Sequence, residues 1–75
     1  QVIPNPSDGR VNLIVNCNTC EDAVIKIYNS LGEMILDEKR SINNLQFDLS
    51  AYNKGLYLFE VRAGQNLKAI RVVIE

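Results

Sequence analysis

The chain has 75 residues, eight of them basic and nine acidic, and its formal net charge is −1 at pH 7. A length of this order corresponds to one small domain, and 47% hydrophobic with 23% charged residues is an ordinary globular balance. The basic residues form no stripe, which argues against a nucleic-acid partner, and no apolar run approaches the roughly 20 residues that a membrane-spanning helix needs. The first residues lack the charged start and apolar core of a signal peptide, so we expect a piece cut from a longer protein or a mature product.

The chain opens with a turn-rich segment, Pro4 to Arg10, which contains two prolines and a glycine. Each proline fixes its own φ and pushes the preceding residue toward extended geometry, and Asp8 can bond to the backbone downstream of it. We therefore expect a turn that aims the first strand. A calcium loop would need about six oxygen ligands, and Asp8 alone does not supply them.

Residues 11–16 predict a strand, because apolar and polar residues alternate along most of this stretch. Val11, Leu13 and Val15 share the face that should point into a core. Ile14 is the exception to the alternation, so the strand is expected to be covered on one face and partly on the other.

Two cysteines follow in C-x-x-C spacing, Cys17 and Cys20. A zinc site needs four ligands, and a chain with two cysteines and no histidine offers half of such a site. A thioredoxin-like redox pair belongs to an α/β pattern that this sequence lacks. We expect a local disulfide or two idle thiols, with no bound metal and no cofactor.

The middle of the chain, residues 21–40, carries two conflicting patterns. Its apolar residues fall at helical spacing, yet residues 24–28 are rich in β-branched and aromatic side chains. The composition of residues 29–32 is typical of a turn, and Gly32 would cost a helix interior about 1 kcal/mol. We predict a hairpin with strands over 23–28 and 33–38, a turn over 29–32, Ile25 and Ile27 pointing inward, and a solvated charged run over 37–41.

The last part of the chain predicts three more strands. Residues 45–49 alternate strictly, and a corner over 50–55 follows, where Tyr52 is expected to close the end of the core. A hairpin then has strands over 55–62 and 67–74, joined by a turn whose Gly and Asn suit positive φ. The side chains expected to point inward are Leu45, Phe47, Leu49, Tyr57, Phe59, Val61, Ile70, Val72 and Ile74, with Lys68 as an exception at a strand end.

Together these elements give six short antiparallel strands at roughly ten-residue spacing, or seven if Val2 and Ile3 pair as well. Regular spacing with turn signals predicts an all-β sandwich or small barrel. Two packed sheets also explain why both ends of the chain carry strands with one apolar face. Nothing in the pattern suggests catalysis, because the chain has no histidine and its acids are scattered on turns and strand ends. We expect no enzyme.

Four pieces of sequence, taken in their order and spacing, resemble one family. They are Pro4-Asn5-Pro6-Ser7-x-Gly9, Ile27-Tyr28-Asn29-x-x-Gly32, Asp48-Leu49-Ser50-x-x-x-x-Gly55-x-Tyr57, and Lys68-x-Ile70 followed by a branched run. The chain is similar over essentially its whole length to the type A C-terminal sorting domain of the type IX secretion system of Bacteroidetes-group bacteria. The pair Cys17 and Cys20 is not part of that pattern.

The resemblance implies an immunoglobulin-like β-sandwich, a single domain over residues 1–75 at the C-terminus of a larger secreted protein. It implies that the domain, itself not catalytic and without a cofactor, directs an N-terminal cargo through the periplasm and across the outer membrane to the cell surface or the medium. The implied partners are the type IX translocon and a signal-processing peptidase. The residues implied in recognition are Pro4, Asn5, Pro6, Gly9, Gly32, Gly55, Tyr57, Lys68 and Ile70.

A translocon could read a folded surface, or an exposed strand edge by strand addition. The outward set of the last strand is apolar for a solvent face, and it is either an interface or covered by the other sheet or the cargo. Its members are Leu67, Ala69, Arg71 and Val73. The alternative function is an immunoglobulin-like accessory module of an adhesin, although carbohydrate binding usually relies on exposed aromatic side chains and the chain has no tryptophan.

Overall fold

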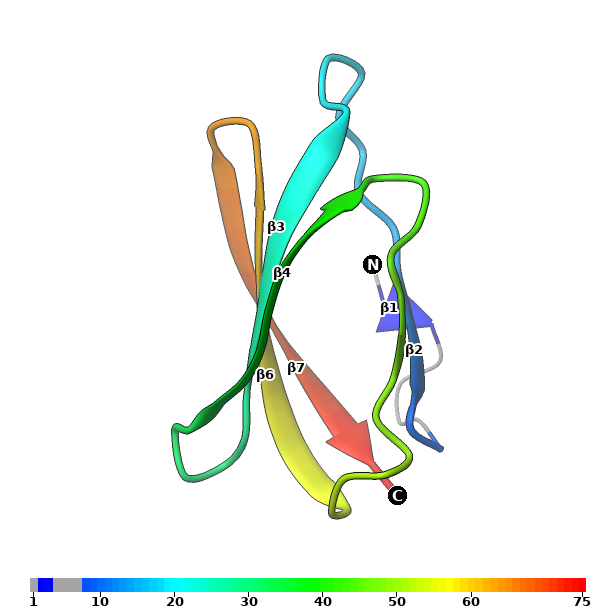
Figure 1. Ribbon diagram of the computed structural model, residues 1–75, viewed down its shortest axis with the longest axis vertical. Coiled ribbons are helices and arrows are strands. Elements are labelled where there is room, and N and C mark those ends of the chain that lie inside the picture. The colour runs from blue at the N-terminus through cyan, green and yellow to red at the C-terminus, as the bar shows by residue number, and fades with distance from the viewer. Residues whose placement is uncertain (1, 4–7) are drawn as a thin grey trace.

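The computed structural model describes residues 2–3 and 8–75, with side chains from residue 8 onward. Pro4, Asn5 and Pro6 lie outside the described residues, so their part in recognition stays a prediction. Within the described part of the chain there is no helix, and seven strands follow one another (Figure 1). They are β1 (Val2–Ile3), β2 (Arg10–Leu13), β3 (Asp22–Tyr28), β4 (Met34–Ser41), β5 (Gln46–Asp48), β6 (Gly55–Ala63) and β7 (Asn66–Ile74).

The strands form two sheets that face each other (Figure 1). One sheet has three strands in the order β1-β2-β5, and the other has four in the order β4-β3-β6-β7. Every neighbouring pair is antiparallel. The predicted all-β sandwich is confirmed, including the hairpin within residues 21–40 and the pairing of Val2 and Ile3. The arrangement is compatible with an immunoglobulin-like fold.

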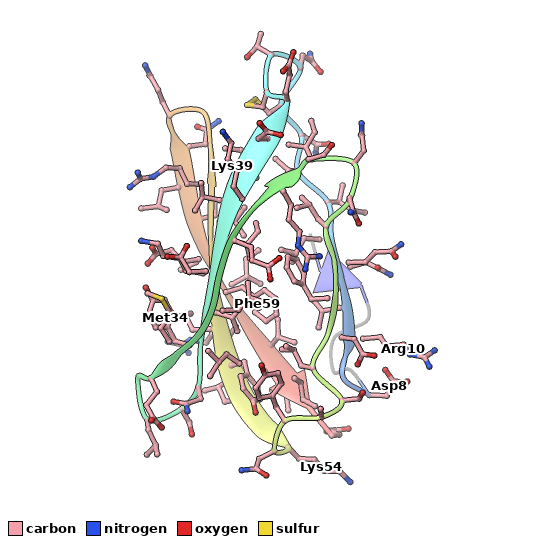
Figure 2. The ribbon with its side chains drawn as sticks, in the orientation of Figure 1. Asp8, Arg10, Met34, Lys39, Lys54 and Phe59 are labelled. Carbon is pink, nitrogen blue, oxygen red and sulfur yellow. A yellow bond between two sulfur atoms is a disulfide. The ribbon has the colours of Figure 1, made fainter. Side chains whose placement is uncertain are left out.

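Alternation along the strands brings the predicted inward side chains together between the two sheets. All of them are buried except Val15 and Ile70, which are half-buried and pack against the core. Phe59 lies in the middle of the molecule with 0% of its surface exposed (Figure 2). Its ring meets Phe47 at a centroid distance of 5.9 Å and an interplanar angle of 77°. This edge-to-face pair joins β6 to β5 across the sandwich.

Two strand ends differ from the predicted ones by three residues, and the other boundaries agree within one residue. β2 ends at Leu13, before the predicted end at residue 16, because its partner β5 is only three residues long. β4 continues to Ser41 through the charged run, because it stays paired with β3 as far as Asp22. β4 lies at the edge of its sheet, and an edge strand tolerates charged side chains that a central strand would not.

The corner before β6 is closed by a different tyrosine from the expected one. Tyr52 is 44% exposed, so the prediction that it closes the core is wrong. Tyr57 is buried instead, and its hydroxyl donates a hydrogen bond to the backbone carbonyl of Asn53. Because Tyr57 stands on the inward face of β6, it can fill the core and bond the corner at the same time.

The C-terminal hairpin turns through Gly64 and Gln65. Gly64 has a φ of 61°, and no described residue other than glycine has a positive φ. This combination fits a two-residue turn with glycine in its first central position, which suits the twist of paired strands. The turn places Ala63 opposite Asn66 and fixes the register of all nine residues of β7.

Candidate functional site

Gly9 allows the turn before β2 to pack directly against the corner after β5. It is buried, and its φ is 113°. A Cβ atom at this position would lie 2.8 Å from both the Cα and the backbone N of Ser50. The Leu49 N–H donates to the Gly9 carbonyl at 2.6 Å. Glycine is therefore required here by close backbone contact as well as by conformation.

The spacing Asn29-x-x-Gly32 is explained by the turn between β3 and β4. The Asn29 side-chain oxygen accepts hydrogen bonds from the N–H groups of Leu31 at 3.0 Å and Glu33 at 2.9 Å. The Gly32 N–H donates to the Asn29 carbonyl at 3.0 Å. Gly32 itself has a φ of 82°. An asparagine that bonds its own downstream backbone and a glycine at positive φ are what this turn needs.

Gly55 begins β6 with a φ of 143°. No atom lies within 4 Å of the place where a Cβ would stand, so the constraint here comes from the backbone conformation and not from a clash. Figure 1 shows that the corner before β6, the turn between β3 and β4 and the end of β7 lie at the same end of the sandwich. The fold therefore brings Gly32 and Gly55 to one end of the molecule.

Lys68 and Ile70 lie apart from that end, in the first half of β7. They face Val61 and Phe59 of β6, respectively, so they share the inward face of the sheet. Ile70 is half-buried and packs against the core, whereas Lys68 is exposed. The residues implied in recognition thus form no single cluster in the part of the chain that is described.

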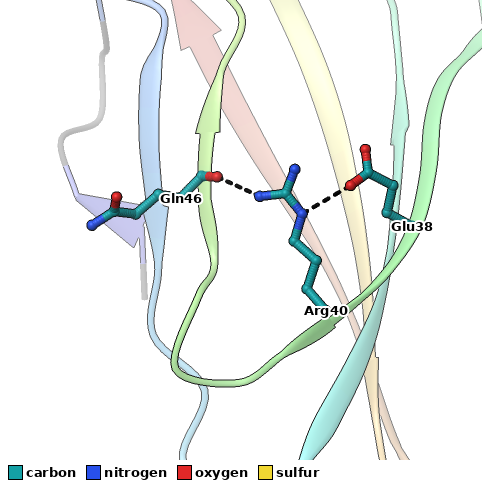
Figure 3. Close-up of polar contacts among 3 residues, drawn as sticks. All are labelled: Glu38, Arg40 and Gln46. Carbon is teal, nitrogen blue, oxygen red and sulfur yellow. Dashed lines mark hydrogen bonds and ion pairs between the residues drawn. The ribbon is translucent and has the colours of Figure 1, made fainter.

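The sheet edges on one side of the sandwich are guarded by charged side chains. On β4, Lys39 Nζ lies 3.6 Å from Asp22 Oδ2, and Arg40 Nε donates to Glu38 Oε1 at 3.0 Å. The Arg40 guanidinium also donates from Nη1 to the backbone carbonyl of Gln46 on β5 at 2.6 Å (Figure 3). It lies 4.2 Å over the Phe47 ring as well. Charges of this kind oppose pairing with a further strand.

The edge formed by β7 is different. The strand is nine residues long, and its two charged residues, Lys68 and Arg71, are both basic. No described side chain forms a hydrogen bond to the β7 backbone. Leu67 is 55% exposed and Val73 is 39% exposed. The interpretation that the second sheet covers the outward face of β7 is therefore wrong. That sheet packs on the opposite face, which carries Val72 and Ile74.

Exposed apolar side chains continue from β7 across the outer face of the four-stranded sheet. Leu56 pairs with Val73 and Leu58 with Arg71. Tyr28 pairs with Leu58 on one side and with Met34 on the other. These cross-strand pairs place an outer apolar patch on the sheet, which consists of Tyr28, Met34, Leu56, Leu58 and Val73. A connected apolar surface of this kind is typical of a binding face.

The described residues contain no group of three or more metal-ligating side chains and no helix long and apolar enough to cross a membrane. Cys17 and Cys20 form a disulfide with a Cα–Cα distance of 5.4 Å. Hydrogen bonds from the side chain and backbone of Ser50, with Arg10 nearby, lower the pKa of Asp48 from its ordinary value of 3.8. That carboxylate is therefore charged at neutral pH and bonds the corner after β5.

The model of one protein family, described as the secretion system C-terminal sorting domain, matches residues 1–75. The match covers every residue of the chain. The chain belongs to this family. No curated protein matches it significantly. Sorting domains of this family direct an attached cargo for export by the type IX secretion system, and they are generally not enzymes.

The sequence did not single out most of the outer patch of the sorting domain. Leu56 and Leu58 alternate with Tyr57 and Phe59, so residues 56–59 are apolar on both faces. That signal could have located the patch, because a strand with one solvated face should carry polar residues at every second position. Met34 and Tyr28 join the patch only through the register of β3 with its two neighbours, which the sequence alone does not give.

Proposed function

We propose that this sorting domain is carried at the C-terminus of a larger secreted protein and is recognised in its folded state by the outer-membrane type IX translocon. Recognition follows delivery of the cargo to the periplasm. The free edge of β7 pairs with an extended segment of the translocon, and the outer apolar patch supplies contacts beside it. The observation that carries the proposal is a contrast between edges. Charged side chains pair at the β4 edge and one bonds the β5 backbone, whereas β7 carries two basic side chains and, among the described residues, no side-chain bond to its backbone.

The register of the hairpin supports strand addition at this edge. Ala63 and Asn66 flank a two-residue turn, and such a flanking pair exchanges both of its hydrogen bonds. Alternation then directs the N–H and C=O groups of residues 67, 69, 71 and 73 away from β6. These groups give main-chain affinity to an added strand, while the side chains on β7 give specificity.

The motif residues then divide into two groups. The first group affects recognition only indirectly, by specifying the fold, because each residue is explained by a turn, a backbone contact or the core. It consists of Gly9, Gly32, Gly55 and Tyr57. Lys68 and Ile70 stand on β7 itself and contact the translocon or set the shape of its edge. The domain performs no catalysis and holds no cofactor. A signal-processing peptidase then removes it from the cargo.

The test measures export of the full-length secreted protein in three variants. Ala69→Pro removes one outward N–H from the β7 edge without removing a bond to β6, a position where edge strands accept proline. Lys68→Glu reverses the charge of the side chain next to Ala69 on β7. Asn18→Pro is the matched control, because it places proline at the second position of the exposed turn in which the Cys20 N–H approaches the Cys17 carbonyl.

We expect Ala69→Pro and Lys68→Glu to reduce surface or medium cargo several-fold while Asn18→Pro is exported normally. The unfolding midpoint of each variant, measured beside export, separates recognition from folding. Normal export of Ala69→Pro in a folded domain would show that the β7 edge is not read by strand addition.

A further inference from the structure

The inner face of β7 is covered along only part of its length. β1 has two residues and β2 has four, whereas β7 has nine. Beyond the end of β2 a groove of about 230 Å³ lies between residues 13–16 and the far half of the β6–β7 hairpin. Its floor contains the buried side chains of Leu13, Val61 and Ala63.

The rim of the groove has a mixed character. Val15 and Ile70 are half-buried there, which leaves apolar surface partly open to water. Asn16, Asn66 and Lys68 border the same groove and are exposed. An occupant should therefore present an apolar side chain to the floor and polar backbone to the rim, which is what an extended peptide does.

The register of β1 leads directly into this groove. Val2 pairs with Leu13 and Ile3 with Asn12 in an antiparallel ladder. A segment before Gln1 that continues the ladder in this register reaches Asn16 within two residues, at roughly 3.4 Å each. The residue directly before Gln1 then stands opposite Val15. Cross-strand partners share a face, so the side chain of that residue enters the groove.

We propose that the segment connecting the cargo to this sorting domain docks in the groove as a continuation of β1. The inference rests on the proposed function only in that it takes a cargo to precede the domain. The register assigns an apolar residue, best a β-branched one, to the position directly before Gln1. We assign the groove to this segment and not to a second copy of the domain, because the register of β1 leads the segment's own chain into it.

Docking gives the junction a defined geometry. β1 runs antiparallel to β2, so a segment that extends the start of β1 passes toward the loop that contains Cys17 and Cys20. The turn at Gly64 lies at the same end, because Gly64 is close to the Cys20 sulfur. The cargo is thus attached at the end of the sandwich opposite the last residues of β7. The free edge of β7 stays open, because the segment fills its inner face and not its edge.

The backbone of residue 16 offers a direct reporter. The Leu13 N–H donates to the Leu45 carbonyl at 2.9 Å, so its bond points toward the β5 side. Alternation along an extended chain directs the N–H of Asn16, three residues on, to the opposite side, where β1 lies. A docked segment should bond this N–H and slow its exchange with solvent.

The experiment compares two full-length secreted proteins, one with its native junction and one in which the four residues before Gln1 are replaced by Gly-Ser-Gly-Ser. Hydrogen exchange is measured at Asn16, with the Phe59 amide in the centre of the sheet as the internal control. We expect exchange at Asn16 to be several-fold faster with the flexible replacement and unchanged at Phe59.

Equal exchange at Asn16 in the two proteins, whether fast or slow, overturns the proposal. Export of the same two proteins is recorded separately. A failure of export with the native junction counts against the proposed function. The hydrogen-exchange result at Asn16 tests the docking of the segment independently of export.

Discussion

Phe59 contributes directly to the contact between the two sheets. It has no exposed surface and its ring meets Phe47 of the opposite sheet. We expect Phe59→Ala to lower the free energy of unfolding by about 3–5 kcal/mol, which is comparable with the whole stability of many small domains. Urea denaturation followed by circular dichroism measures it.

The adjacent residue provides the control. Leu58 points to the outer face and is 36% exposed, so Leu58→Ala should change stability by less than about 1 kcal/mol. An unfolding midpoint of Phe59→Ala equal to that of the unsubstituted domain would mean that the assigned inward face of β6 is wrong.

A comparison of Gly9 with Gly32 separates the cost of an unfavourable backbone conformation from the cost of a steric contact. Both have positive φ, and alanine at such a conformation costs about 1–2 kcal/mol. Only Gly9 has a neighbouring backbone 2.8 Å from the missing Cβ, since nothing lies within 4 Å at Gly32. Gly9→Ala should therefore be the more destabilising substitution by urea denaturation. Equal losses of stability would show that the contact with Ser50 relaxes without cost.

At the scale of elements, the loop closed by Cys17 and Cys20 is a small addition to the fold. The disulfide spans a sequence separation of three residues, and the chain-entropy relation gives about 2 kcal/mol for so short a ring. We expect the double variant Cys17→Ser, Cys20→Ser to fold with an unchanged circular-dichroism spectrum and to lose at most that amount. Chelator should have no effect on the unsubstituted domain.

Two results would contradict this view of the loop. Unfolding of the double variant would show that the disulfide is needed to fix the segment between β2 and β3. Loss of structure on adding chelator would show a structural metal that the two cysteines help to bind.

The strands were predictable where alternation was strong. The period of two placed Tyr57, Phe59 and Val61 inward, and turn residues correctly favoured a hairpin over a helix in residues 21–40. The charged end of β4 was not predictable as strand, because the charges that guard a sheet edge have the composition of a loop. The early end of β2 depends on the length of β5, which is a tertiary property.

The candidate site was predictable in part. Sequence order and spacing identified the family, and the apolar outward set of β7 was visible in its alternation. Which edges are guarded could not be read from the sequence, because the Arg40 bond to the Gln46 carbonyl crosses from one sheet to the other. That the Tyr57 hydroxyl bonds the Asn53 carbonyl while Tyr52 stays exposed depends on the path of the corner, which the sequence alone does not give.

At the scale of the whole molecule, the domain combines a fold specified by its motif residues with a surface that those residues mostly do not form. The glycines and Tyr57 build turns and core, while the β7 edge and the outer apolar patch remain exposed. A signal of this kind should be transferable, because the proposed recognition surface belongs to the domain and not to the cargo.

Transfer of the signal is the most direct test of the account. Residues 1–75 are fused behind a signal peptide and a fluorescent cargo, and the fusion is produced in a bacterium with the type IX machinery and in a mutant that lacks it. We expect fluorescence at the cell surface or in the medium of the competent strain only. Retention of a folded, intact fusion in the periplasm of both strains would contradict the account.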